Sequence, residues 1–345
     1  MHPFTRRRFL AASALLPSGL TAALDLVQPA TLLAARPDVA PGPRLKTGLN
    51  AYSFVELLQE NAKDSTRGID LFGVLDFCAK LGFDGIDVTG YFFPGYPAAP
   101  ADAYLVKLKR HAFDLGLGLS GTGVRNDFTT ADANVRAEGV QRVKTWIEVA
   151  AKLGAPTVRA FAGSQPPFKN WQQASGNAPR ATVEGWVADA LRECARHGEK
   201  FGVIVAAQNH GDLIASGPQH LSLLERVGHP WCAAMVDTGN YLTADPYADI
   251  ALVAPRAVNW QIKETTHNTL DSPRVDLERV MKIVRRSGYH GYLPIETLRM
   301  SRTDYDSFTE VPLMLAKLRK AIDSTASVFD PRDSVRRVVK PSSRP

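Results

Sequence analysis

Four short apolar segments in the second half of the chain each end in polar residues that could bind a metal ion or a sugar. The segments are residues 203–210, 233–240, 257–264 and 291–298, and their polar ends include Gln208, Asp237, Gln261 and Glu296. In a parallel β/α barrel, the carboxyl ends of the strands meet at one face, where chemistry takes place. If each segment is a strand of such a barrel, these four side chains meet around one centre.

The rest of the chain between residues 46 and 324 alternates short apolar runs with amphipathic helical patterns, which is typical of parallel β/α units. We expect strands at 46–53, 85–88, 117–121, 157–161, 203–207, 233–237, 258–263 and 292–296. Helices are expected at 70–81, 101–115, 132–153, 182–201, 217–227, 245–253, 276–287 and 308–324. The pattern predicts a single (β/α)8 TIM barrel. An open, doubly wound sheet is the main alternative, but no Gly-rich phosphate-binding motif follows an early strand.

The formal net charge of +6 comes from the two ends of the chain. Residues 1–40 carry +2 and residues 331–345 carry +4, so the body is neutral. A neutral body has no excess positive charge for a phosphate backbone, and we expect no nucleic-acid partner. The cysteines Cys78, Cys194 and Cys232 are odd in number and widely spaced, so they indicate buried apolar residues rather than a disulfide framework.

The N-terminus contains the run TRRRFL at residues 5–10, which resembles the twin-arginine export motif. The mildly apolar stretch 11–24 is too short and too interrupted for a stable membrane span. We therefore expect residues 1–35 to be a twin-arginine signal peptide that directs the protein to the periplasm through the twin-arginine machinery. A basic start of a cytosolic protein is the alternative.

The remaining chain divides into three predicted parts. We expect residues 36–45 to form a Pro-rich linker, residues 46–323 the barrel and residues 324–345 a basic, disordered tail.

The body, over roughly residues 46–322, resembles the xylose isomerase-like TIM barrel family, which includes sugar phosphate isomerases and epimerases, inosose dehydratases and apurinic endonucleases. The motifs are QNH at 208–210, where the family usually has Glu-Asn-His, and DTGN at 237–240. QIKE follows at 261–264, where many members have His-x-Lys-Asp, and Glu296 ends the last strand. Because the motifs occur in order at the ends of successive strands, they favour both the fold and a shared site.

The resemblance implies one divalent ion bound by Gln208, Asp237, Gln261 and Glu296. Glutamine at position 261 has precedent in hydroxypyruvate isomerases, whereas Gln208 replaces the usual glutamate. Two carboxylates and two amides suit Mn²⁺ or Mg²⁺ better than Zn²⁺. The alternatives are a metal-free site in which both glutamines make hydrogen bonds, and structural salt bridges for the two acids.

The exchange at position 208 also limits the chemistry, because an amide cannot accept a proton. We expect a reaction with one base, either Glu296 or His210, next to a carbonyl group. The hypothesis is a metal-dependent isomerase or lyase acting on a sugar, keto-sugar or cyclitol, and the alternative is a non-catalytic periplasmic sugar-binding barrel. Trp260 should point to the helices, since it is adjacent to Gln261. Candidate substrate contacts are Lys263, Asn240, Arg159, Asp87 and Trp171.

Overall fold

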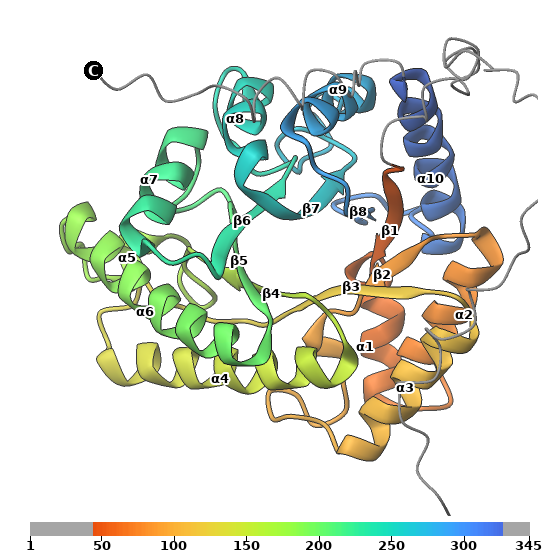
Figure 1. The fold of residues 1–345 in the computed structure, drawn as a ribbon, viewed down its shortest axis with the longest axis horizontal. Helices are drawn as coiled ribbons and strands as arrows, with labels where there is room; N and C mark the ends of the chain where they lie inside the picture. The colour runs from red at the N-terminus through yellow and green to blue at the C-terminus, as the bar shows by residue number, and fades with distance from the viewer. Residues whose placement is uncertain (1–43, 327–345) are drawn as a thin grey trace, which may run out of the picture. The chain divides into compact units, whose positions relative to one another are not determined.

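The protein forms a closed barrel of eight parallel strands in a computed structural model that describes residues 44–326. The strands run in order around the barrel, and β8 pairs with β1 to close it. Figure 1 shows the strands as an inner ring with the helices outside. The predicted single (β/α)8 barrel is confirmed. The strands are β1 (Lys46–Asn50), β2 (Gly85–Asp87), β3 (Gly118–Gly123), β4 (Thr157–Phe161), β5 (Ile204–Gln208), β6 (Cys232–Asp237), β7 (Ala257–Lys263) and β8 (Tyr292–Glu296).

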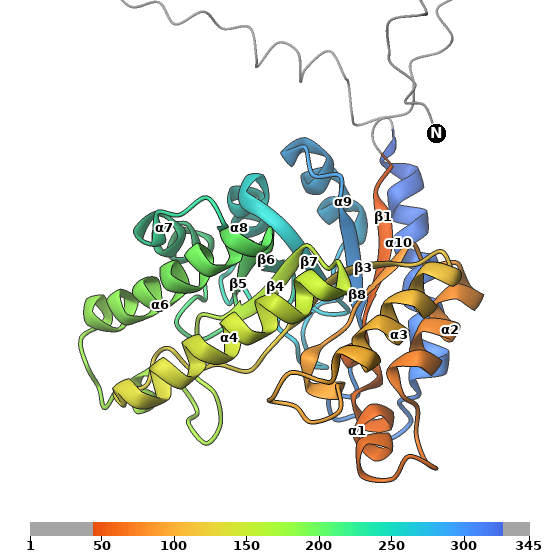
Figure 2. The same cartoon turned by 60° about the horizontal axis from the view of Figure 1, so that its bottom comes forward.

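The helices that cover the barrel begin and end with the local chemistry that the sequence supplies. Asp70 caps α2 by accepting a hydrogen bond from the Gly73 amide, and Gly82, with φ of 70°, ends the same helix in the left-handed region. Figure 2 shows the two long helices α4 and α6 side by side. The helices are α1 (Val55–Lys63), α2 (Leu71–Leu81), α3 (Asp102–Asp114), α4 (Ala133–Leu153), α5 (Trp171–Ala174), α6 (Arg180–Phe201), α7 (Gly217–Val227), α8 (Pro246–Val253), α9 (Leu277–Ser287) and α10 (Ser307–Ser324).

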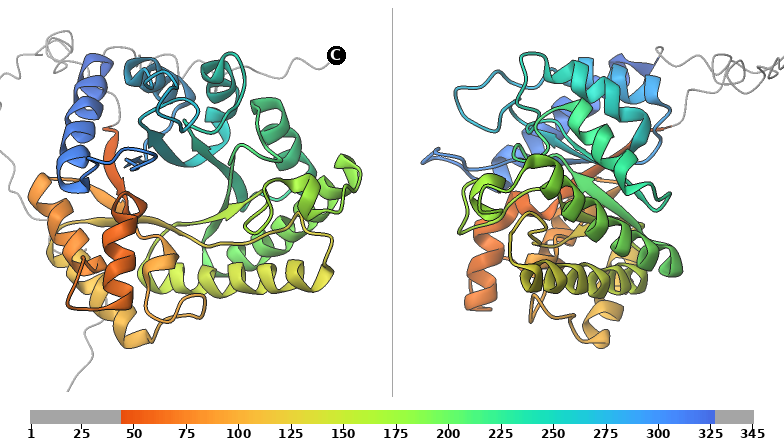
Figure 3. Two further views of the ribbon diagram at one scale, coloured as in Figure 1. Left: turned by 180° about the vertical axis from the view of Figure 1, so that it is seen from behind. Right: turned by 90° about the vertical axis from the view of Figure 1, so that its left-hand side faces the viewer.

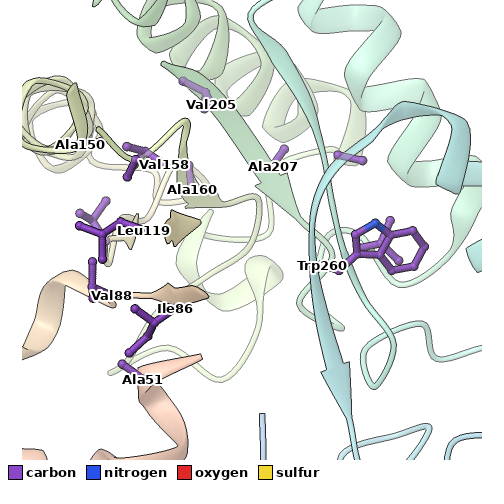
Figure 4. Close-up of a cluster of buried hydrophobic side chains, with 14 of the residues drawn as sticks. Ala51, Ile86, Val88, Leu119, Ala150, Val158, Ala160, Val205, Ala207 and Trp260 are labelled. Atoms are coloured by element: carbon purple, nitrogen blue, oxygen red, sulfur yellow. The ribbon is translucent and has the colours of Figure 1, made fainter. Parts of the chain in front are cut away.

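The main hydrophobic core lies between the outer faces of the strands and the helices. Side chains alternate along each strand, so Ile86, Val158 and Val205 point outward and are completely buried. Figure 4 shows these residues within the buried apolar cluster, together with Trp260 from β7. Trp260 packs edge-on against Tyr289, with ring centroids 5.9 Å apart, as expected for a residue on the helix side. The inward positions of the strands are thereby left for polar residues.

The structure differs from the sequence prediction mainly just after β1. The expected strand continued to residue 53, but the chain turns into a short 3-10 helix, η3 (Ala51–Phe54), and then into α1. The turn begins because the Asn50 side chain accepts a hydrogen bond from the Tyr52 amide. The long segment after β4 also contains a short helix, α5, which the sequence prediction left as a loop.

Figure 3 shows the barrel from behind and from the side, with the loops that follow the strands. The three cysteines are free and buried, as predicted. No helix in residues 44–326 is long and apolar enough to cross a membrane. The predicted signal peptide, most of the linker and nearly all of the predicted basic tail lie outside the described residues.

Candidate active site

A cavity of about 320 Å³ lies over the residues that end or follow the strands. This is the face of a TIM barrel where chemistry takes place, and the volume is at the lower end of the range for small-molecule pockets. The wall combines aromatic, cationic and amide side chains. The lining residues are Asn50, Tyr52, Thr89, Tyr91, Arg125, Arg159, Phe161, Gln165, Pro166, Gln208, His210, Gln261, Lys263, Asn268, Glu296 and Leu298.

The four predicted metal ligands converge at one point in the barrel. In the strand ladder, Asp237 lies opposite Gln261. The Gln208 amide nitrogen donates to Asp237 Oδ2 over 2.8 Å and also to Gln261 Oε1. The Gln261 amide nitrogen donates to Glu296 Oε2 over 2.7 Å. The strand register therefore places two carboxylates and two amides in a continuous hydrogen-bonded row.

Lys263 places a positive charge between the two acids of this row. Its ammonium group contacts Glu296 Oε1 and lies 3.6 Å from Asp237 Oδ2. Burial alone would lower the pKa of Lys263, but the two carboxylates outweigh burial and raise it. Burial raises the pKa of Asp237 to about 6, although Lys263 acts to lower it. Lys263 is therefore charged at neutral pH and stabilises both acids.

Two asparagines hold Asp237 in position. The Asn240 side chain donates to Asp237 Oδ2 over 2.8 Å, and the Gly239 amide donates to Oδ1 over 2.9 Å. The Asn209 side chain bonds both the amide and the carbonyl of Asp237, at 2.8 and 2.9 Å. Asn240 does not line the cavity in this structure, where its side chain positions Asp237, and its direct contact with substrate stays a prediction. Asn209 in the QNH motif ties β5 to β6, a role that the sequence analysis missed.

The donor set fits an oxygen-preferring divalent ion. Gln208 Oε1 is buried and makes no hydrogen bond within the described residues, which leaves one acceptor unsatisfied. Rotating this amide would turn its oxygen toward Asp237 and Gln261, an arrangement of oxygens that only a cation would stabilise. Asp237 and Glu296 would add the two negative charges. Within residues 44–326 no group of three or more His, Cys, Asp or Glu residues forms a metal cluster, so such a site depends on the two amides.

His210 follows β5 and lines the pocket beside this row. Its ring packs against Phe161, with centroids 4.5 Å apart, and one side is open to the cavity. Enclosure by protein on the other sides and the cations Arg159, Lys263 and Arg125 lower the pKa of His210 to about 3. The ring is therefore neutral at pH 7, with a free nitrogen available to accept a proton or a hydrogen bond.

Two further predicted substrate contacts lie outside the pocket wall. Asp87 is completely enclosed below the floor, where Asn259 donates to its Oδ2 over 3.1 Å, and burial raises its pKa to about 6. Asp87 is the last residue of β2 and is buried there. Trp171 begins α5 and packs near Arg180, 5.6 Å from ring centroid to guanidinium. Substrate contacts through Asp87 and Trp171 stay predictions, whereas Arg159 and Lys263 line the cavity.

The aromatic wall of the pocket was not predicted from the sequence. Tyr52 and Tyr91 follow β1 and β2, and their rings pack edge-on with centroids 6.2 Å apart. The expected first strand ran to residue 53 and so included Tyr52, which instead lies in the 3-10 helix η3. Rings of this kind can pack against the apolar face of a sugar.

A closed parallel barrel with acids, amides and a lysine at the carboxyl ends of its strands has the general plan of a TIM-barrel enzyme. Residues 75–321 match the xylose isomerase-like TIM barrel family, and the chain belongs to that family.

Solved structures of similar fold include D-psicose 3-epimerase from Clostridium cellulolyticum H10, with a TM-score of 0.65 and 15% identity, covering 81% of this chain and 99% of that one. Another is 3-keto-D-glucoside 4-epimerase from E. coli, with a TM-score of 0.60 and 14% identity, covering 80% of this chain and all of that one. The TM-scores show a shared fold. A curated relative, the C-glycoside deglycosidase alpha subunit of Microbacterium trichothecenolyticum, is 27% identical over 199 residues, which are 56% of this chain and 46% of the relative. The matched region thus spans about half the length of that relative.

Proposed function

We propose that the protein is a sugar-acting isomerase or lyase that moves a proton at a carbon next to a carbonyl group. The observation that carries this proposal is Glu296, a carboxylate on the pocket wall whose two oxygens are held by Lys263 and Gln261. A fixed carboxylate can take a proton from the substrate carbon. The neighbouring ammonium group can then stabilise the oxygen that gains negative charge.

His210 supplies a second proton-transfer group in the same cavity. Because Gln208 cannot accept a proton, the site has fewer bases than a two-carboxylate epimerase would need. One base suffices for isomerisation, in which the proton returns to the neighbouring carbon. One base also suffices for elimination, in which the electron pair of the broken C–H bond expels a substituent from the next carbon. In that case the base takes the substrate proton, and a second group protonates the departing oxygen.

A divalent ion, Mn²⁺ or Mg²⁺, belongs to the proposal as the cofactor. Gln208, Asp237, Gln261 and Glu296 would bind it, each through an oxygen. When bound, such an ion polarises substrate oxygens and stabilises negative charge that develops on them. Lys263 supplies a fixed positive charge beside the same two carboxylates, which a bound ion would share with the ammonium group.

The relatives support a sugar-like substrate as part of this proposal. The curated relative is a C-glycoside deglycosidase subunit, and the two solved structures are epimerases of a ketohexose and of a keto-glucoside. The aromatic and amide lining of the cavity is compatible with a polyol. We also propose that the twin-arginine motif at residues 5–10 directs export to the periplasm, a route that carries folded proteins with their cofactors.

The proposal is tested by turnover with the purified full-length chain. The protein, with and without added Mn²⁺, is incubated with ketohexoses, 3-keto-glucosides and cyclitols, each in neutral, acid and phosphorylated forms, and products are followed by NMR. We expect conversion of at least one keto-sugar, with Glu296→Gln inactive. Binding of a sugar without any conversion would instead favour a non-catalytic sugar-binding barrel, the role that Gln208 in place of a base would suit. If the chain neither binds nor converts any of these sugars, both functions are contradicted.

A further inference from the structure

Two arginines stand on the side of the pocket across the barrel from Glu296. Arg159 belongs to β4 and is only 5% exposed, and Arg125 follows β3 and is open to the cavity. Strands β3 and β4 lie opposite β7 and β8 in a barrel of eight consecutive strands. Within residues 44–326, neither guanidinium has a carboxylate oxygen within the 4.0 Å of a salt bridge. Lys263, in contrast, is paired with Glu296.

The Arg159 side chain is fixed in one orientation. Its Nη1 donates to the Val124 carbonyl over 2.9 Å, and its Nη2 donates to the Tyr91 hydroxyl over 2.5 Å. The guanidinium also lies over the Phe161 ring, 3.9 Å from the centroid. Gly123 makes room for it, because a Cβ at this position would lie 2.7 Å from Arg159 Nε. The absence of a side chain at Gly123 thus leaves the space that the Arg159 guanidinium occupies.

Arg125 presents its guanidinium without a hydrogen-bond partner in the described residues. The group stacks on Tyr91, 4.8 Å from the ring centroid. Its backbone, by contrast, is held at both ends: the Arg125 amide donates to the Tyr96 hydroxyl over 2.9 Å, and Arg142 donates to the Arg125 carbonyl over 3.0 Å. A fixed backbone therefore presents several free N–H donors to the cavity.

Burying the Arg159 guanidinium without an acidic partner costs free energy, and its stacking on Phe161 offsets only part of that cost. The planar group matches carboxylate and phosphate oxygens better than neutral hydroxyls. We propose that Arg125 and Arg159 form a subsite for an anionic group, a carboxylate or a phosphate, on a sugar substrate. The inference rests on the proposed function, which assigns proton transfer at Glu296 to the other end of that substrate. It adds that the substrate is a sugar acid or sugar phosphate, with its anionic group on the β3–β4 side and its reacting carbon at Glu296.

Calorimetric titration of the full-length chain at constant ionic strength tests the subsite without requiring turnover. The probes are D-glucuronate, D-glucose 6-phosphate and neutral D-glucose. We expect at least one anionic probe to bind at least about 10-fold more tightly than glucose, the minimum for a charge-assisted hydrogen bond. The stronger of the two anionic probes identifies carboxylate or phosphate as the recognised group.

Variants assign that preference to the two arginines. Arg125→Met should remove most of the preference, and Arg125→Lys should keep part of it. Arg159→Lys tests the buried partner without removing its charge and should weaken the anionic probe, because a lysine lacks the planar fork. The control is Arg110→Met, an exposed arginine paired with Asp114 on α3, which should change nothing.

Two results would overturn the subsite: neither anionic probe binds more tightly than glucose, or the preference survives in both Arg125→Met and Arg159→Lys. A chain that binds the anion but converts no sugar would contradict the proposed function alone.

Discussion

Lys263 lies opposite Glu296 in the ladder between β7 and β8, and its ammonium group contacts the Glu296 carboxylate inside the barrel. The same ammonium lies 3.6 Å from Asp237, so one cation serves two buried acids. This relationship follows from strand register, because Lys263 is two residues after Gln261 and shares its inward face. The charge balance of the pocket therefore depends on this one lysine.

Replacing Lys263 with methionine should lower the free energy of unfolding by about 3–5 kcal/mol at pH 8, because two buried carboxylates lose their cation. Urea denaturation measures the change. Lys282→Met is the matched control, since Lys282 pairs with Glu278 on the surface and its loss should have an effect of about 1 kcal/mol or less. Added Mn²⁺ should stabilise Lys263→Met more than the native chain. Equal effects of the two substitutions would contradict the proposed role of Lys263.

The metal proposal predicts that Asp237→Ala loses bound Mn²⁺ while the fold remains. Gln208→Glu should bind the ion more tightly, because it adds a negative charge to the donor set. Elemental analysis after dialysis and calorimetric titration measure both effects. Asp87→Asn is the matched control: it also removes a buried carboxylate, but one below the pocket floor, and it should keep the metal. Stoichiometric metal in Asp237→Ala would exclude the proposed site.

Much of this architecture could be predicted because the same two signals repeat eight times. Apolar runs and amphipathic helical patterns placed each unit, and glycines such as Gly82 end five of the described helices. Three predicted strand or helix spans agree with the structure at both ends. The convergence of Gln208, Asp237, Gln261 and Glu296 followed from their positions at the ends of successive strands. These features depend on local periodicity, which a single sequence carries directly.

The remaining parts of the site depend on contacts between distant segments. Asp87 could not be distinguished from a pocket residue, because its place below the floor follows from where β2 ends relative to Asn259. Tyr52 was hidden because one side-chain hydrogen bond from Asn50 ends the first strand early. The unpaired state of Arg125 depends on which acids lie within reach, and a sequence without its fold does not contain that information.

Buried His220 predicts a pH dependence of stability. Its ring bonds the Tyr241 hydroxyl and the Ala207 carbonyl, and burial lowers its pKa from 6.5 to about 4. The unfolded chain therefore takes up a proton first as the pH falls below 6.5, and stability is lost until the folded state also protonates near pH 4. This contribution should be about 2 kcal/mol between pH 7 and pH 5.

The measurement compares the native chain with His220→Gln by urea denaturation at pH 7 and pH 5. Asp87 and Asp237 have raised pKa values, so they take up protons in the folded state first and increase the free energy of unfolding as the pH falls. This opposite effect is the same in both proteins and cancels in the comparison. The native chain should lose about 2 kcal/mol more than the variant. Parallel losses in the two proteins would show that His220 does not titrate as the structure predicts.

The export proposal predicts that lysine at both Arg6 and Arg7 keeps the protein in the cytoplasm. The change preserves charge, so a merely basic N-terminus would behave as before, whereas a twin-arginine signal would fail. Cell fractionation of the double variant, with Arg8→Lys as the control, measures the outcome. Normal periplasmic levels of the double variant would show that the motif is not used.

We propose that Glu296 removes a proton next to a substrate carbonyl. The most direct measurement is deuterium uptake from D₂O into a panel of keto-sugars, followed by NMR with Mn²⁺ present. The native chain should exchange one proton, from one face only, and Glu296→Gln should reduce the rate at least about 100-fold. A His210→Gln variant distinguishes the two proton-transfer groups. If it still exchanges deuterium but forms no product, Glu296 is the group that removes the proton. Undiminished exchange in Glu296→Gln, or label entering from both faces in the native chain, would contradict a one-base reaction with Glu296 as the base.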